Sequence, residues 1–251
     1  MFDRAMKLRS PGVFITATDT EIGKTTVACG VAASLRGRGQ RVGVCKPIAT
    51  GCRFDVSRLV AEDAEALAHY SDCRQSLDVI NPVRYREALA PWVAAERSSR
   101  AVHTGSIYDS MHRIDEACDV VVVEGIGGVM VPIAEGVTVL DMAAAIGYPV
   151  VVVTRGDLGT LNHTAMTCEL IKRRGLRLAG LVINRYKTDT ADVAESTNPY
   201  YLAKQNGTKV LATVPEATGG VEPHKARMAD GVLEALDMTD WMGVCKRAKS
   251  G

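Results

Sequence analysis

Residues 16–26 read Thr16-Ala17-Thr18-Asp19-Thr20-Glu21-Ile22-Gly23-Lys24-Thr25-Thr26. The apolar run 13–15 precedes this stretch, and a helical pattern with Val27, Val31 and Leu35 on one face follows it. A strand, a loop of small residues, Gly-Lys-Thr and a helix form the arrangement of a phosphate-binding P-loop. Because the backbone N–H groups of such a loop point inward and the helix N-terminus adds positive potential, the sequence predicts a triphosphate site.

Two side chains of this loop have expected roles. Lys24 is expected to reach the β- and γ-phosphates, and the hydroxyl of Thr25 to ligate Mg²⁺. The strict pattern has glycine six residues before the lysine, where this chain has Thr18. The alternative is therefore an ordinary strand-to-helix turn, and the flanking strand and helix favour the phosphate site over it.

The composition favours a single intracellular domain. The chain has 251 residues, 47% hydrophobic and 24% charged, with a formal net charge of +1. That net charge gives no electrostatic reason to expect binding to nucleic acid or to an anionic membrane. No apolar stretch is long enough to span a bilayer. The seven cysteines contain no Cys-x-x-Cys pair, which favours reduced thiols and a cytoplasmic location. We expect one domain over residues 1–251, with a mobile lead-in at 1–12 and a mobile tail at about 245–251.

Apolar runs that are typical of strands alternate with helical patterns. The expected strands are Val13–Ala17, Arg41–Cys45, Val120–Glu124, Pro149–Thr154, Leu178–Asn184 and Lys209–Val214. The expected helices lie near 24–37, 57–70, 105–117, 138–146, 160–175 and 226–237. Because runs of four valines suit strands buried on both faces, we predict an α/β fold of the P-loop NTPase type, a doubly wound, mostly parallel sheet with helices on both faces. Ligands of such sheets bind beyond the carboxyl ends of the strands.

Two of these strand ends carry charged residues. Lys46 follows the second expected strand, in Lys-Pro-Ile-Ala-Thr-Gly at 46–51, and is placed to supply a second cation to a transferring phosphoryl group. The alternative for Lys46 is an ordinary solvated lysine. Glu124 ends a four-valine run and precedes Gly125, Gly127 and Gly128, which matches the acidic position that supports Mg²⁺ in P-loop enzymes. The alternative for Glu124 is a surface glutamate that begins a turn.

Other candidates have weaker patterns. The segment 159–164 opens a helix after the fourth strand, where we expect either a side-chain cap or a site for a substrate carboxylate. Asn184 and Pro215-Glu216 follow the fifth and sixth strands, and they either bind an adenine or form turns. Asp63 is one of three acids in one helical segment, an arrangement that usually forms a solvated face.

These segments resemble those of the dethiobiotin synthetase family, ATP-dependent cyclo-ligases of biotin biosynthesis. The matching segments are residues 18–25, 46–51, 81–82 with 90–91, 124–128 with 131–133, 158–163 and 180–184. The resemblance runs in order from about residue 13 to about residue 185. The Thr-Asp-Thr-Glu form of the P-loop, combined with Lys-Pro-x-x-Thr-Gly, is far more specific than a P-loop alone. One departure is Ala17, where family members usually carry glycine; a Cβ there is expected to narrow the loop.

The resemblance implies a full set of site residues. Lys46, Lys24 and Thr20 would be catalytic, and Thr25, Asp63 and Glu124 would hold Mg²⁺. The nucleotide would contact Glu21, Ile22, Gly23, Lys24, Thr25, Thr26, Glu124, Gly125 and Gly127, and its adenine would contact Asn184, Pro215, Glu216 and Ala217. The substrate would contact Thr20, Lys46, Thr50, Gly159, Thr160, Leu161 and Asn162, the last four near the interface of a homodimer.

The resemblance also implies the reaction. The small-molecule substrates would be 7,8-diaminononanoate, CO₂ or bicarbonate, and ATP, with Mg²⁺ as cofactor. A carbamate on N7 would attack the γ-phosphorus, and the second amine would close a cyclic urea from the resulting mixed anhydride. Such chemistry requires positioning and charge neutralisation rather than a covalent nucleophile. Replacing Lys24 or Lys46 is expected to remove turnover and leave the fold intact.

Two other protein classes remain as alternatives. The cobyrinate or cobyrate amidating ligases carry an additional glutaminase domain, for which this chain has no room. The MinD/ParA-like switch ATPases bear a lysine five residues before the P-loop lysine, where this chain has Asp19. Slow ATP hydrolysis that lipid or DNA stimulates, without any response to the diamine, would favour the switch class.

Overall fold

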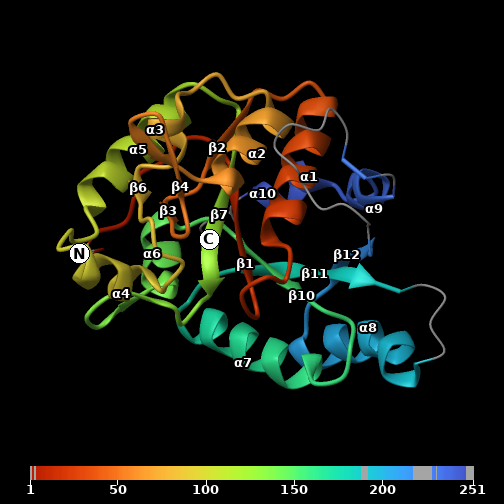
Figure 1. Cartoon of the computed structure of the whole chain (residues 1–251). Helices are drawn as coiled ribbons and strands as arrows, with labels where there is room; N and C mark the ends of the chain where they lie inside the picture. Colours follow the sequence, from red (N-terminus) through yellow and green to blue (C-terminus); the bar gives the residue numbers. More distant parts are fainter. Residues whose placement is uncertain (1, 3, 188–191, 217–227, 230, 247–251) are drawn as a thin grey trace.

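A six-stranded parallel sheet forms the centre of the molecule in this computed structural model, which describes residue 2 and residues 4–187, 192–216, 228–229 and 231–246 (Figure 1). The strands, in spatial order, are β12 Val210–Pro215, β11 Leu178–Tyr186, β10 Val150–Thr154, β1 Gly12–Ala17, β7 Val120–Gly128 and β2 Val42–Cys45. Each neighbouring pair is parallel. The predicted parallel α/β sheet is therefore confirmed.

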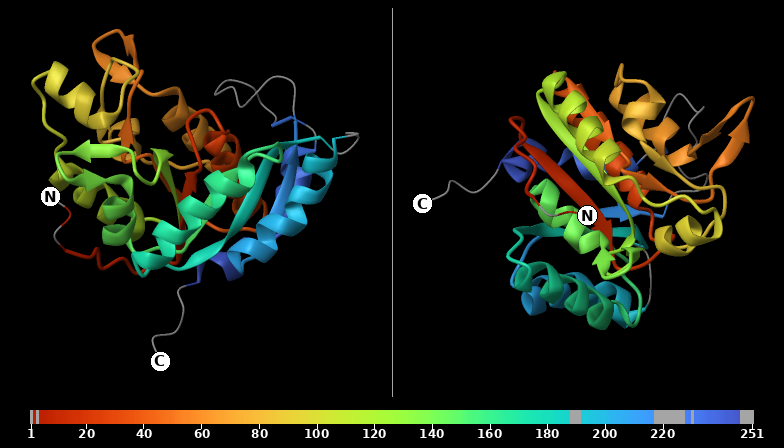
Figure 2. Two further views of the ribbon diagram at one scale, coloured as in Figure 1. Left: turned by 90° about the horizontal axis from the view of Figure 1, so that it is seen from below. Right: turned by 90° about the vertical axis from the view of Figure 1, so that its left-hand side faces the viewer.

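Helices cover both faces of this sheet (Figures 1 and 2). One face carries α1 Lys24–Gly37, α2 Glu62–Ser71, α9 Val232–Asp237 and α10 Trp241–Cys245, and the other carries α5 Thr104–Glu116, α6 Val139–Ile146, α7 Thr160–Arg173 and α8 Val193–Asn206. Within the described ranges, no helix has the length and apolar character that a membrane span requires.

The valine runs show how the sequence produces two cores. Val120 and Val122 belong to the core beneath α1, whereas Val121 and Val123 belong to the core beneath α5 and α6. All four are fully buried. Because successive side chains of a strand point to opposite faces, only a strand covered on both sides accommodates four consecutive valines.

Short elements connect the strands near β2. They are α3 Leu77–Ile80, α4 Pro91–Arg97 and three two-stranded pairs: β3 Ile48–Ala49 with β6 Val83–Arg84, β4 Arg53–Asp55 with β5 Arg58–Val60, and β8 Pro132–Ala134 with β9 Val137–Thr138. The expected helix near 57–70 was thus wrong in its first turn, because the chain folds back as a hairpin and α2 begins at Glu62. Three acids in the first turn of α2 favour that later start through the helix dipole.

The prediction missed α8 and placed the start of α9 too early. Pro199 lies inside α8, and the helix has little separation of apolar and polar faces, so its pattern resembles a loop. Asp192 caps α8 by accepting hydrogen bonds from the backbone N–H groups of Ala194 and Glu195, and this Asp-x-x-Glu start is a signal that sequence reasoning could have used. The described part of the last predicted helix begins at Val232, after Gly231 in a left-handed conformation.

Part of the expected mobile lead-in is packed against the molecule. Met6 and Leu8 are buried, and the backbone N–H groups of Arg9 and Ser10 donate to the Asp115 carboxylate at 2.7 and 2.8 Å. These contacts attach the segment to α5. At the other end, Cys245 is buried in α10 although the sequence placed it in the tail.

Candidate active site

A cavity of about 580 Å³ lies where the loops after β1 and β2 meet the carboxyl-terminal part of β7 and the start of α2. This is the carboxyl edge of three neighbouring strands, the edge at which parallel α/β sheets bind ligands. Its lining includes most of the residues expected to act in catalysis or to hold Mg²⁺ or phosphate: Thr20, Glu21, Gly23, Lys24, Thr25, Thr26, Lys46, Thr50, Asp63, Glu124 and Gly127. The sequence therefore identified the residues that converge here.

The P-loop joins β1 to α1. Gly23 precedes the helix with φ 89°, a left-handed conformation that favours glycine. The Asn184 side chain donates to the carbonyl oxygen of Ile22 at 2.8 Å, and a Cβ built on Gly23 would lie only 2.0 Å from that same amide nitrogen. Only glycine allows β11 and the loop to approach this closely. The amide of Asn184 thus supports the loop, in addition to its expected role at the adenine.

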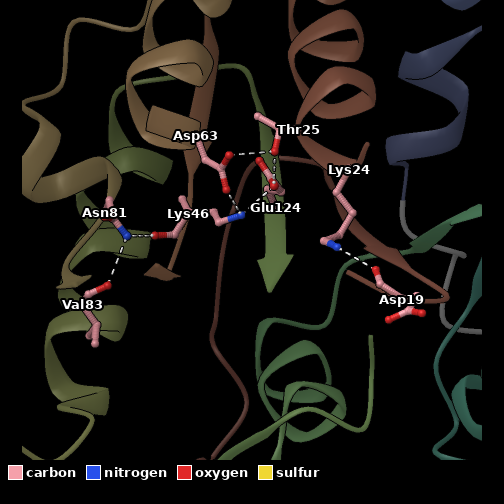
Figure 3. Close-up of polar contacts among 8 residues, drawn as sticks. All are labelled: Asp19, Lys24, Thr25, Lys46, Asp63, Asn81, Val83 and Glu124. Carbon is pink, nitrogen blue, oxygen red and sulfur yellow. Dashed lines mark hydrogen bonds and ion pairs between the residues drawn. The ribbon is translucent and has the colours of Figure 1, made fainter. Parts of the chain in front are cut away.

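Lys46 lies between two carboxylates. Its Nζ is 2.6 Å from Asp63 Oδ2 and 2.6 Å from Glu124 Oε1 (Figure 3). Burial by itself lowers the pKa of Lys46, but the charges of Glu124 and Asp63 outweigh burial and raise it above the ordinary value. Complete burial raises the pKa of Glu124, although Lys46 opposes the shift. Both side chains are almost fully buried. The alternatives of a solvated Lys46 and a surface Glu124 are therefore excluded.

Thr25 completes a cluster of oxygens that suits Mg²⁺. Its Oγ1 lies 2.9 Å from Asp63 Oδ1 and 2.9 Å from Glu124 Oε1, and its single proton can donate to only one of them at a time. Glu124 Oε2 is buried without a hydrogen-bond partner among the described residues. Mg²⁺ commonly takes one or two carboxylates together with substrate phosphates. The residues present therefore fit the ion, although the described residues hold no group of three or more His, Cys, Asp or Glu side chains that could bind a metal on their own.

Lys24 begins α1, and its ammonium group turns back toward its own loop. Its Nζ donates to the carbonyl oxygen of Asp19 at 3.0 Å, as Figure 3 shows. Burial, with a contribution from the positive charge of Lys46, lowers the pKa of Lys24 to about 8. The two ammonium groups thus act on one another electrostatically, and an anion placed between them would relieve their repulsion.

The backbone of Lys46 is held from both sides. Its N–H donates to the carbonyl oxygen of Ile80 at 2.8 Å, and its carbonyl oxygen accepts from Asn81 Nδ2 at 2.6 Å. The same amide donates to the Val83 carbonyl oxygen at 3.3 Å. Asn81 is buried, and within the described ranges its side chain donates only to these two backbone carbonyl oxygens. In the sequence, Asn81 stands out only through the family resemblance, and no local pattern pairs it with Lys46.

Asn81→Ala is expected to lower the free energy of unfolding by about 1–3 kcal/mol, because two buried carbonyl oxygens lose their donor. It is also expected to lower kcat about 100-fold, because a small misplacement of a catalytic group has an effect of that size. The matched control is Asn206→Ala in α8, where the Asn206 amide also donates to a buried carbonyl oxygen. Chemical denaturation and steady-state kinetics should show similar losses of stability, with loss of kcat in Asn81→Ala alone.

Five of the expected nucleotide contacts lie outside the cavity lining: Ile22, Gly125, Asn184, Pro215 and Glu216. The Ile22 side chain is buried in the core, and only its carbonyl oxygen is engaged, by Asn184. A Cβ on Gly125 would contact the Phe14 ring at 3.2 Å, so this glycine permits close packing against β1. Ala17 ends β1 with its side chain in the core. The methyl group of Ala17 packs in the core beneath α1, and the expected narrowing of the loop stays a prediction.

Residues 159–162 are not part of this cavity. Gly159 precedes α7 with φ 95°, and no side chain caps the helix. The hydroxyl of Thr160 instead lies 2.8 Å from Thr154 Oγ1 and donates to the Arg155 carbonyl oxygen. Leu161 and Asn162 follow in the first turn, and the substrate role expected for this segment stays a prediction.

The expected adenine turn follows β12. Pro215 pairs with Tyr186, and the N–H of Glu216 donates to the Tyr186 carbonyl oxygen at 3.3 Å. Ala217 lies outside the described residues. The turn is adjacent to the end of β11 rather than in the cavity lining, and its contact with adenine stays a prediction.

Four residues of the cavity lining were not among the expected site residues. They are Ala49, Glu62, Ile126 and Arg185. Each of them adjoins an expected site residue in the sequence, and Arg185 comes directly after Asn184 at the end of β11. Apart from that adjacency, the local sequence does not distinguish them from other residues.

Known proteins resemble this chain at two levels. A family model described as "AAA domain" matches residues 11–223. The ATP-dependent dethiobiotin synthetase BioD of Anaeromyxobacter sp. (strain Fw109-5) is 39% identical over 201 residues, 80% of this chain and 88% of that protein. The protein of the same name from Bacillus subtilis (strain 168) is 35% identical over 206 residues, 82% of this chain and 87% of that protein. These matches confirm the resemblance inferred from the motifs.

Solved structures of switch ATPases share the fold at much lower identity. A chain of the MinC:MinD cell division protein complex of Aquifex aeolicus has a TM-score of 0.58 and 12% identity, covering 96% of this chain and 98% of its own. A ParA family ATPase from Chlorobium tepidum TLS has a TM-score of 0.57 and 12% identity, covering 91% and 96%. Identities this low establish the fold and nothing about activity.

Proposed function

The chain belongs to the ATP-dependent dethiobiotin synthetase family and to the AAA-domain family, and on that premise we propose that it closes 7,8-diaminononanoate and CO₂ into a cyclic urea at the expense of ATP. It is an ATP-dependent ligase of biotin biosynthesis. The observation that carries the proposal is one cavity lined by Lys24 from the P-loop and Lys46 from the loop after β2, with Thr25, Asp63 and Glu124 beside them.

The proposed reaction has three steps. The N7 amine adds to CO₂ and loses a proton, giving a carbamate. A carbamate oxygen then attacks the γ-phosphorus, and the bond to the bridging oxygen breaks as ADP leaves. The second amine attacks the carbamoyl carbon, loses a proton and expels inorganic phosphate, which closes the ring.

The side chains of this cavity meet the needs of phosphoryl transfer. Charge spreads over the equatorial oxygens in the transition state, so catalysis depends on positioned cations. Lys24 and Lys46 supply two, and Lys46 is held in place at both its backbone and its ammonium group. Thr20 and Thr50 line the same cavity, where their hydroxyl groups would position the diamine or its carbamate.

Thr25, Asp63 and Glu124 are the residues that would hold Mg²⁺. When bound there, the ion would supply neutralisation of phosphate charge in the transition state. The convergence of the three oxygen ligands and the unpartnered Glu124 Oε2 support this assignment. Asn184 and the turn at 215–216 would receive the adenine.

A homodimer forms part of the proposal. Leu158 and Met166 are 87% and 53% exposed at and beyond the start of α7, next to the segment 159–162 that lies outside the cavity of its own chain. A partner chain packed on this face would cover these apolar side chains and would bring the N-terminus of α7 toward a substrate carboxylate.

The test is ATP turnover with the diamine and bicarbonate, followed by mass spectrometry. We expect ADP and the cyclic urea to form in equal amounts, and no ADP above background when the diamine is omitted. ATP hydrolysis that ignores the diamine and increases with lipid vesicles or DNA would contradict the ligase and favour the switch class. Asp19 argues against that class, because it occupies the position of the additional lysine.

A further inference from the structure

Arg185 stands in a strained position at the end of β11. Its φ is 54°, the left-handed region that side chains other than glycine rarely adopt. The pairing of β11 with β12 shifts register between Ile183 and Tyr186, where β11 uses one residue more than β12. This bulge explains the conformation, because an additional residue in one strand changes the direction in which its side chains point.

The strain directs a cation into the active-site cavity. Arg185 lines that cavity together with Glu21, Gly23 and Thr26 of the P-loop. The preceding residue, Asn184, fixes the position of the strand end by its hydrogen bond to the Ile22 carbonyl oxygen. Backbone strain of this kind persists where the surroundings hold it, and it occurs preferentially at ligand sites.

Among the described residues, the guanidinium group has no partner that would explain its position. The side chain is exposed, and within the described ranges no ion pair or hydrogen bond engages it. Lys46, by contrast, is neutralised by two carboxylates. Arg185 therefore contributes to this cavity a positive charge that forms no ion pair with a described residue, beside a loop that is built for phosphates.

The sheet order places this charge on a particular side of the nucleotide. β11 and β2 lie on opposite sides of β1, so Arg185 and Lys46 approach the P-loop from opposite directions. The γ-phosphate end is expected at Lys24, Lys46 and Glu124. We propose that Arg185 binds phosphate oxygens of the nucleotide on the β11 side of the P-loop, nearer the α-phosphate than the γ-phosphate. The inference rests on the proposed ATP site, and the planar guanidinium suits two phosphate oxygens at once.

The test measures binding by calorimetry with two probes, Mg²⁺-ADP and Mg²⁺-tripolyphosphate. Arg185→Ala and Arg185→Gly are expected to weaken both probes about 10-fold, the size of a lost charge-assisted hydrogen bond. Arg185→Lys should recover part of that loss. In the kinetic assay, KM for ATP should rise while KM for the diamine stays unchanged.

Arg185→Gly also separates binding from folding. Glycine relieves the left-handed strain, so its Tm should equal or exceed that of the parent while its affinity falls. The charge-matched control is Arg74→Ala, an exposed arginine that does not line this cavity, and its affinity should stay unchanged. Unchanged affinity in the Arg185 variants overturns the inference, as does a loss with ADP but not with tripolyphosphate, which would indicate contact with the base or ribose.

Different results would contradict the role of Arg185 and the ligase proposal. An enzyme that forms the cyclic urea and tolerates Arg185→Ala with unchanged affinity contradicts only the role of Arg185. A parent protein that binds both probes in an Arg185-dependent manner, yet forms no cyclic urea, contradicts only the ligase.

Discussion

Lys46→Met is expected to lower turnover about 1,000-fold, because the transferring phosphoryl group loses a positioned cation. It is also expected to lower the free energy of unfolding by about 3–5 kcal/mol, because Glu124 stays buried without its counter-charge. The sequence alone predicted that the fold would stay intact after replacement of Lys46. The buried ion pair instead predicts a loss of stability. Steady-state kinetics and urea denaturation measure the two effects.

The double variant Lys46→Met with Glu124→Gln separates charge from catalysis. Removing both members of a buried ion pair has a smaller effect on stability than removing one. The double variant should therefore recover much of the lost stability while turnover stays at the level of Lys46→Met. Near-normal turnover in either variant would exclude Lys46 as a catalytic residue.

Lys24→Met should also lower turnover about 1,000-fold. Unlike Lys46→Met, it should not lower the free energy of unfolding. The folded protein holds this ammonium less favourably than water does, since burial and Lys46 lower its pKa to about 8. Its one hydrogen bond, to the Asp19 carbonyl oxygen, lies at a part-buried loop. Thermal unfolding and ATP titration measure both parts of the prediction.

The control for Lys24→Met is Lys172→Met, in which a lysine of α7 also donates to a backbone carbonyl oxygen, that of Asn206. That variant should keep full turnover. A Lys24→Met protein that binds ATP and turns over like the parent would contradict the P-loop assignment, whatever its stability.

Much of the fold follows from the sequence because its signals are local. The four-valine runs can only be strands buried on both faces, and Gly-Lys-Thr after such a strand gives a P-loop. Once the strands are placed in a parallel sheet, Lys46 and Glu124 must meet at its carboxyl edge, since β2 and β7 are neighbours. Their direct ion pair is a geometric consequence of that pairing.

The missed features depend on contacts that no local pattern contains. The hairpin at 53–60 replaces a helical turn because its strands pair with one another. Asn81 matters through one hydrogen bond to a backbone 35 residues away in sequence. Arg185 looks like any charged residue until the bulge against β12 determines where its side chain points. Each of these features comes from tertiary pairing, which overrides local preference.

The central claim is that a carbamate oxygen, not water, attacks the γ-phosphorus in this cavity. The direct measurement uses freshly dissolved ¹⁸O-bicarbonate with the diamine and ATP, and determines the mass of the released phosphate before the label exchanges with water. The account predicts that each phosphate carries one oxygen from bicarbonate, because that oxygen bridges carbon and phosphorus in the mixed anhydride. Phosphate without the label, formed at the same rate as ADP, would contradict the account and show that the protein only hydrolyses ATP.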